Sequence, residues 1–72
     1  MGYKLQIRAL REAKGLTQRE TAQQLHVTPS AVAKWETGDT TPTLENLIAM
    51  STLFCCSLDA LLGREPPERT SA

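Results

Sequence analysis

Residues 17–38 have the sequence TQRETAQQLHVTPSAVAKWETG, which contains two signals for the start of a helix. Thr17 and Glu20 are spaced as in a capping box, in which each side chain accepts a hydrogen bond from the backbone N–H of the other residue. Thr28 and Pro29 mark a second start, because threonine caps helices well and proline fits the first helical position. The glycine that closes the stretch is typical of a helix end. The stretch therefore predicts two short helices with a tight turn between them.

Each of these helices has a narrow apolar side. Ala22 and Leu25 are three positions apart in the first helix, and Val32 and Trp35 have the same spacing in the second, so each pair is expected to face inward. The outward residues of the second helix are expected to be Pro29, Ser30, Ala33 and Lys34. This is the layout of a helix-turn-helix, a motif that lays its second helix in the major groove of DNA.

The rest of the chain predicts an all-α fold, a compact five-helix bundle in which the second and third helices form the helix-turn-helix. The first helix is expected over residues 3–14, and a fourth begins at Pro42 or Thr43. A short fifth helix follows Ser57. The inward residues of the first helix are expected to be Ile7, Leu10 and Ala13. Those of the fourth are expected to be Leu44, Leu47, Ile48, Met50, Ser51 and Phe54.

The length of 72 residues allows one small core and no second folded domain. We expect this domain to occupy residues 1–63. Residues 64–72 contain two prolines and only one apolar residue, the final alanine, so they are expected to form a disordered polar tail.

The net charge is zero, but the charges are unevenly distributed. Residues 1–34 carry six basic and two acidic side chains, a net charge of +4, while residues 35–72 carry two basic and six acidic ones, a net charge of −4. The half that contains the predicted helix-turn-helix can therefore present a positive surface to phosphates.

Several classes of protein are excluded by composition. Cys55 and Cys56 are adjacent and are the only cysteines, which rules out a disulfide scaffold and a zinc finger. The chain has no nucleophile–base pair, metal cluster or glycine-rich phosphate loop, so we expect no enzyme, no metal, no cofactor and no small-molecule ligand. It also has no apolar run suited to a membrane or a signal sequence, and a soluble, cytoplasmic protein is expected.

Five strings, in this order and spacing, resemble the phage-repressor and Cro-like helix-turn-helix family, also called the xenobiotic-response-element family. They are LR at 10–11, GLTQ at 15–18, KWETG at 34–38, LENL at 44–47 and SLDALL at 57–62. The resemblance covers residues 4–63. It implies a sequence-specific transcriptional regulator, repressor-like, that binds double-stranded DNA as a homodimer on a two-fold site.

The resemblance also implies roles for particular residues. Gln18 matches a position that donates to a DNA phosphate, Arg19 lies beside it, and Thr37 belongs to a segment that meets phosphates. The matched base-reading residues lie near the start of the third helix and are Pro29, Ser30 and Lys34, while Thr28, which caps this helix, is also expected to be a DNA-binding residue. Arg11 and Glu36 match a partly buried salt bridge of structural importance.

The chain departs from the family pattern at four places. His26 stands where a turn glycine is usual, and Thr21 replaces a leucine that packs between the helices. Asp39 stands where lysine is common, which weakens the expected phosphate contact of that loop. Cys55 replaces a glycine that ends a helix, so its thiol is expected to be exposed while that of Cys56 is buried.

A second function is compatible with these residues. The neutral net charge and the loop after the third helix, which has no Lys or Arg, also suit a helix-turn-helix that serves as a protein-interaction module, such as an antitoxin or the anchor of an assembly. Titration with nonspecific duplex at low salt distinguishes the two.

Overall fold

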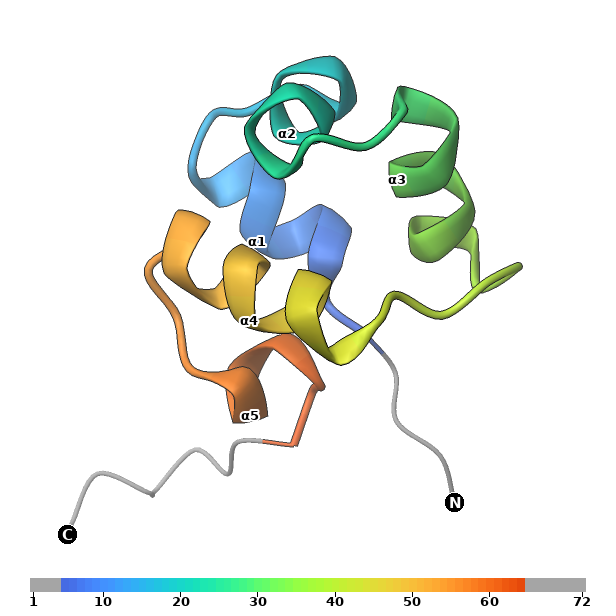
Figure 1. Cartoon of the computed structure of the whole chain (residues 1–72). Helices are drawn as coiled ribbons and strands as arrows, with labels where there is room; N and C mark the ends of the chain where they lie inside the picture. Colours follow the sequence, from blue (N-terminus) through green and yellow to red (C-terminus); the bar gives the residue numbers. More distant parts are fainter. Residues whose placement is uncertain (1–4, 65–72) are drawn as a thin grey trace, which may run out of the picture.

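The computed structural model describes residues 5–64, which form five helices around one core (Figure 1). The helices are α1 (Ile7–Ala13), α2 (Gln18–Leu25), α3 (Pro29–Thr37), α4 (Leu44–Leu53) and α5 (Leu58–Leu61). The expected all-α five-helix bundle is thus confirmed. The predicted tail beyond Arg64 and the first residues of the predicted first helix lie outside the described residues. Over residues 5–64, no helix is long and apolar enough to cross a membrane.

Local hydrogen bonds explain where four of the helices begin. Thr17 and Glu20 form the complete capping box, with N–H to oxygen distances of 3.0 and 2.9 Å. The hydroxyl oxygens of Thr28, Thr43 and Ser57 each accept the backbone N–H three residues later, at 3.0–3.1 Å. These bonds satisfy N–H groups that have no partner within the helix, so each start is encoded by a few neighbouring residues.

The turn between α2 and α3 is made by a residue in a left-handed conformation. His26 has a φ of 61°, and the next N–H, that of Val27, returns to the Ala22 carbonyl at 3.0 Å. Histidine adopts this conformation at a cost of about 1–2 kcal/mol that glycine does not pay. Cys55 ends α4 in the same way, with a φ of 56°. The fold therefore keeps two glycine-like helix ends without glycine.

The core collects side chains from all parts of the bundle. Its buried apolar residues are Ile7, Ala22, Leu25, Val32, Trp35, Met50, Phe54 and Leu61. The Gln6 N–H also donates to the Leu61 carbonyl at 2.9 Å, which joins the start of α1 to α5. α2 and α3 make the most extensive helix–helix contact, and α3 also packs on α1. In Figure 1, α2 and α3 lie together at the top and α5 at the bottom. The helix-turn-helix is thus supported from below by the rest of the bundle.

Two expected inward faces are wrong in part. α1 is shorter than predicted, and Ala13 is exposed, since it lies 240° around the helix from buried Ile7 at about 100° per residue. In α4, Leu44 and Ile48 were expected inside, but they are 66% and 48% exposed. The side of α4 that faces the core contains Met50, which is fully buried. Leu44 and Ile48 lie on other sides of the helix.

The two cysteines also differ slightly from expectation. Cys55 is exposed, as predicted, but Cys56 is only half-buried rather than fully buried. Neither cysteine forms a disulfide.

Thr21 is the weakest point of the core. Its side chain is fully buried between the helices, and its hydroxyl oxygen has no hydrogen-bond partner in the described part of the chain. A buried polar group without a partner has lost its hydrogen bonds to water and gained none in return. The expected weakening at this position is therefore a desolvation cost as well as a loss of packing.

We predict that Thr21→Val raises the free energy of unfolding by about 1 kcal/mol, because it removes the unpaired hydroxyl and keeps the branched shape. In a domain of this size the melting temperature, Tm, should rise by about 5 °C. The matched control is Thr52→Val at an exposed position of α4, where the change should stay within about 0.5 kcal/mol. A fall in the Tm of Thr21→Val would contradict the prediction.

Candidate nucleic-acid interface

The outer surface of α3 is polar at its start, and the polar side chains there are exposed. Pro29, Ser30 and Lys34 are exposed, whereas Val32 and Trp35 are buried against the bundle. Ala33, which was expected on the outer side with them, is half-buried. The hydroxyl of Ser30 and the ammonium of Lys34 have no hydrogen-bond or ion-pair partner among residues 5–64. Both groups are therefore available to a ligand.

Thr28 and Pro29 fix how this surface begins. The Thr28 hydroxyl oxygen accepts the Ala31 N–H at 3.1 Å, and Pro29 is the first helical residue. Because the Thr28 hydroxyl acts only as an acceptor in this bond, its O–H remains able to donate to a ligand.

The start of α2 borders a shallow, open hollow. The hollow is bounded by the end of α1, the first turn of α2 and Pro29 of α3. Gln18 and Arg19 are the first two residues of α2, and their backbone N–H groups have no acceptor within the helix. Arg19 is exposed and its guanidinium has no ion-pair partner in the described residues. Free N–H groups at a helix start, together with a free guanidinium, favour a bound anion.

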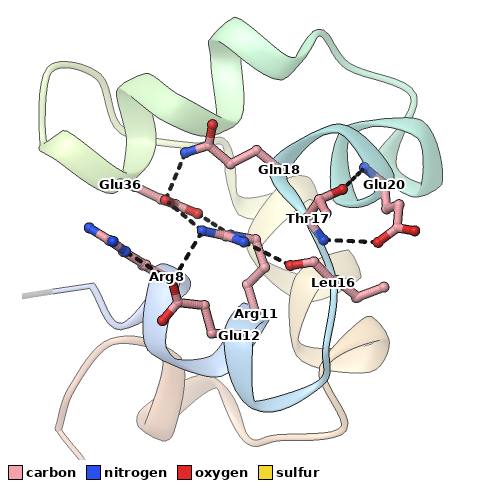
Figure 2. Close-up of polar contacts among 8 residues, drawn as sticks. All are labelled: Arg8, Arg11, Glu12, Leu16, Thr17, Gln18, Glu20 and Glu36. Carbon is pink, nitrogen blue, oxygen red and sulfur yellow. Dashed lines mark hydrogen bonds and ion pairs between the residues drawn. The ribbon is translucent and has the colours of Figure 1, made fainter.

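Arg11, Glu36 and Gln18 form a polar network behind this hollow. The Arg11 Nε donates to Glu36 Oε2 at 2.6 Å, and the Arg11 Nη2 donates to Glu36 Oε1 at 3.3 Å. The Gln18 Nε2 donates to the same Oε1 at 2.9 Å. Figure 2 shows the side chains of Arg11 and Gln18 both directed at the Glu36 carboxylate. The network joins α1, α2 and the last turn of α3.

This ion pair is shielded from water. The side chains of Arg11 and Glu36 are only 9% and 5% exposed. The hydrogen bond with Glu36 raises the pKa of the Arg11 guanidinium, burial opposes this, and the charge of the carboxylate adds to the rise. The Arg11 Nη1 also donates to the Leu16 carbonyl at 2.7 Å, so most of the hydrogen-bond donors of Arg11 are satisfied. A buried charge pair with this many hydrogen bonds holds its geometry tightly.

A second pair at the surface is of a different kind. Arg8 Nε lies 3.2 Å from Glu12 Oε2, four residues along α1, and both side chains are more than half exposed. Water screens such a pair, so it contributes little to stability.

The first N–H groups of the loop after α3 are bonded back to the end of that helix. The Gly38 N–H donates to the Trp35 carbonyl at 3.3 Å, and the Asp39 and Thr40 N–H groups donate to the Lys34 carbonyl at 2.9 and 3.4 Å. The Thr37 hydroxyl donates to the same Lys34 carbonyl at 3.1 Å. The groups that the resemblance assigns to phosphate contact are thus occupied within the protein, and the Asp39 side chain is exposed beside them.

Residues 5–64 contain no group of three or more His, Cys, Asp or Glu side chains that could hold a metal ion. His26 is exposed at the turn and stands alone.

From the sequence, Gln18 is expected only to meet a phosphate, and its bond to Glu36 is not predicted. The two residues are 18 positions apart and lie in different helices. No local pattern signals such a contact, because it depends on how α2 crosses α3.

Comparison with known proteins places this architecture among regulators. A family model described as helix-turn-helix matches residues 7–61. The chain is 38% identical over 65 residues to the HTH-type transcriptional activator BcrR of Enterococcus faecalis, covering 90% of this chain and 32% of BcrR. It is 37% identical over 62 residues to the HTH-type transcriptional regulator AnsR of Bacillus subtilis, covering 86% of this chain and 53% of AnsR. The chain spans about a third to a half of the length of these curated relatives.

The fold is also similar to that of a repressor solved on DNA. The P22 c2 repressor in complex with synthetic operator 9T superposes with a TM-score of 0.74 at 36% sequence identity. The match covers 81% of this chain and 88% of the repressor chain.

We predict that Glu36→Ala lowers the free energy of unfolding by about 3 kcal/mol, because Arg11 would remain buried without its partner. The matched control is Glu45→Ala, since Glu45 is exposed and has no ion pair among residues 5–64, and this change should cost no more than about 0.5 kcal/mol. Urea denaturation of both variants measures the difference. Equal midpoints would mean that the Arg11–Glu36 pair is solvated in solution.

Proposed function

The chain belongs to the helix-turn-helix family of the phage-repressor and Cro type, and on this premise we propose that it regulates transcription by binding double-stranded DNA sequence-specifically. The observation that carries the proposal is the exposed start of α3, where Ser30 and Lys34 have unpartnered polar groups. A helix with such a face, held on one side by α2, suits insertion into the major groove.

Base readout is assigned to the first two turns of α3. The Ser30 hydroxyl can donate to or accept from a base edge, and the Lys34 ammonium suits the O6 and N7 atoms of guanine. Pro29 offers only an apolar contact, for example to the methyl group of thymine. Thr28 lies at the start of this face with a hydroxyl proton to donate. With so few reading groups, the preference is expected at a small number of base pairs.

Phosphate contact is assigned to the start of α2. Arg19 supplies a charge, and Gln18 supplies the N–H of its amide that is not bonded to Glu36. Their backbone N–H groups add the field of the helix start. A contact by Thr37 at the other end of α3 requires its hydroxyl to leave the Lys34 carbonyl, so we assign it a smaller share.

We further propose that the protein binds as a homodimer on a two-fold site in the cytoplasm. One helix of this size contacts only a few base pairs, so a second copy is needed to extend the recognised site. Two copies would place their reading helices about one turn of DNA apart, roughly 34 Å. Sedimentation of the chain with and without a palindromic duplex tests this.

We predict that affinity for DNA falls as salt rises, since bound counterions are released when phosphates are neutralised. Lys14 and Arg19 are exposed, have no ion pair in the described residues and are not assigned to base readout, so at about −0.9 each they give a log–log slope of about −2 per protomer. Arg19→Ala should make the slope less steep by about 0.9. Gln18→Ala should lower the affinity without changing the slope, because the glutamine is neutral.

Fluorescence anisotropy of a labelled duplex, measured at several salt concentrations, provides these slopes. Affinity that does not vary with salt would contradict the electrostatic part of the proposal. If the chain bound no duplex even at low salt, a protein-interaction module would be the better description.

We predict that reading and anchoring residues give different patterns on a panel of single-base variants of the selected site. Lys34→Ala and Ser30→Ala should relax the preference at one or two base pairs, at a cost of about 1–3 kcal/mol on the best site. Gln18→Ala should weaken all sequences alike, because a phosphate contact carries no base information. If Lys34→Ala weakened every variant equally, Lys34 would be a phosphate contact instead.

A further inference from the structure

The amide of Gln18 is already bound within the protein before any ligand arrives. Its Nε2 donates to Glu36 Oε1 at 2.9 Å, and the residue is half-buried. Other glutamines of the same helix, Gln23 and Gln24, are exposed and have no such partner among the described residues. Gln18 therefore differs from its neighbours in having one of its two N–H groups committed.

The acceptor of that bond is itself held from the other side. The Glu36 carboxylate receives two donors from Arg11, at 2.6 and 3.3 Å, and its side chain is 5% exposed. Arg11 in turn donates to the Leu16 carbonyl, two residues before Gln18. The amide of Gln18 thus rests on a chain of bonds that begins and ends next to the start of α2 (Figure 2).

This arrangement has a consequence for a ligand. A primary amide has two N–H donors, and fixing one of them fixes the plane and direction of the other. A glutamine held in this way has already lost the rotamer freedom that a free glutamine loses on binding. The second N–H belongs to a residue at the exposed start of α2, where backbone N–H groups are also unpaired.

The charge of Glu36 does not oppose this role. A bare carboxylate near a phosphate would repel it, but Arg11 lies against Glu36 and neutralises it at contact distance. The pair offers Gln18 a strong acceptor while adding no net charge behind the hollow.

We propose that Glu36 is a positioning residue for DNA binding, which aims the free N–H of Gln18 at a phosphodiester of the duplex. The inference rests on the proposed function, because it assumes that Gln18 meets a phosphate. It extends the role of Glu36 beyond its ion pair with Arg11.

A double-mutant cycle tests it, using the full chain and a mixed-sequence duplex of 20 base pairs at low salt, well below the Tm of every variant. Glu36→Asp keeps the negative charge and withdraws the carboxylate by one methylene from Gln18. Gln18→Met keeps the length of the side chain and removes its donors. We expect Glu36→Asp to weaken binding about fivefold when Gln18 is present and less than about twofold in the Gln18→Met background.

Gln23→Met is the matched control, and it should leave the affinity unchanged. Equal losses from Glu36→Asp in both backgrounds would overturn the inference, since a purely structural effect does not depend on Gln18. If the unmodified chain bound no duplex, the proposed function itself would fail, and the inference with it.

A second measurement needs no substitution. The ¹⁵N relaxation of side-chain amides in the free protein should give a higher order parameter for Gln18 than for Gln23. Addition of duplex should change the chemical shifts of the Gln18 amide and leave its order parameter unchanged. A Gln18 amide as mobile as that of Gln23 would overturn the inference even if Glu36→Asp failed to fold.

Discussion

The buried ion pair between Arg11 and Glu36 is the interaction on which the binding face depends. It joins α1 to the last turn of α3 at 2.6 Å, and the same two residues reach the Leu16 carbonyl and the Gln18 amide at the entry to α2. Two charges removed from water require good geometry to offset their desolvation. That requirement fixes the three helices relative to one another more narrowly than apolar packing alone.

The rest of the core shows what a small domain tolerates around such an anchor. Thr21 is buried with an unpaired hydroxyl, and His26 and Cys55 occupy left-handed conformations that suit glycine. Each feature costs free energy in a fold of this size, where the margin of stability is small. Strong caps at Thr17 and Thr28 act in the opposite direction and keep the helix starts in place.

The distribution of charge matters more for binding than its sum. The chain is neutral, yet Arg19 and Lys34 are exposed without acidic partners, while the charge of Arg11 is paired with that of Glu36. On the proposed assignment, few free cations neutralise phosphates, so a larger share of the affinity is expected from base contacts and from positioned neutral donors such as Gln18. The loop after α3 agrees with this, because the N–H groups of Gly38, Asp39 and Thr40 are bonded to the Lys34 and Trp35 carbonyls rather than left for a phosphate.

By itself, the sequence determined the five helices, most of their ends and the exposed start of α3. Caps such as Thr17 with Glu20 act over three residues, so they can be recognised without a fold. Tertiary structure decided which apolar residues of α4 face inward: Met50 is buried, but Leu44 and Ile48 are exposed. It also decided that Gln18 is bonded to Glu36, 18 positions away. The sequence shows whether each residue is apolar or polar, but the direction of its side chain depends on how its helix is rotated against the neighbouring helices.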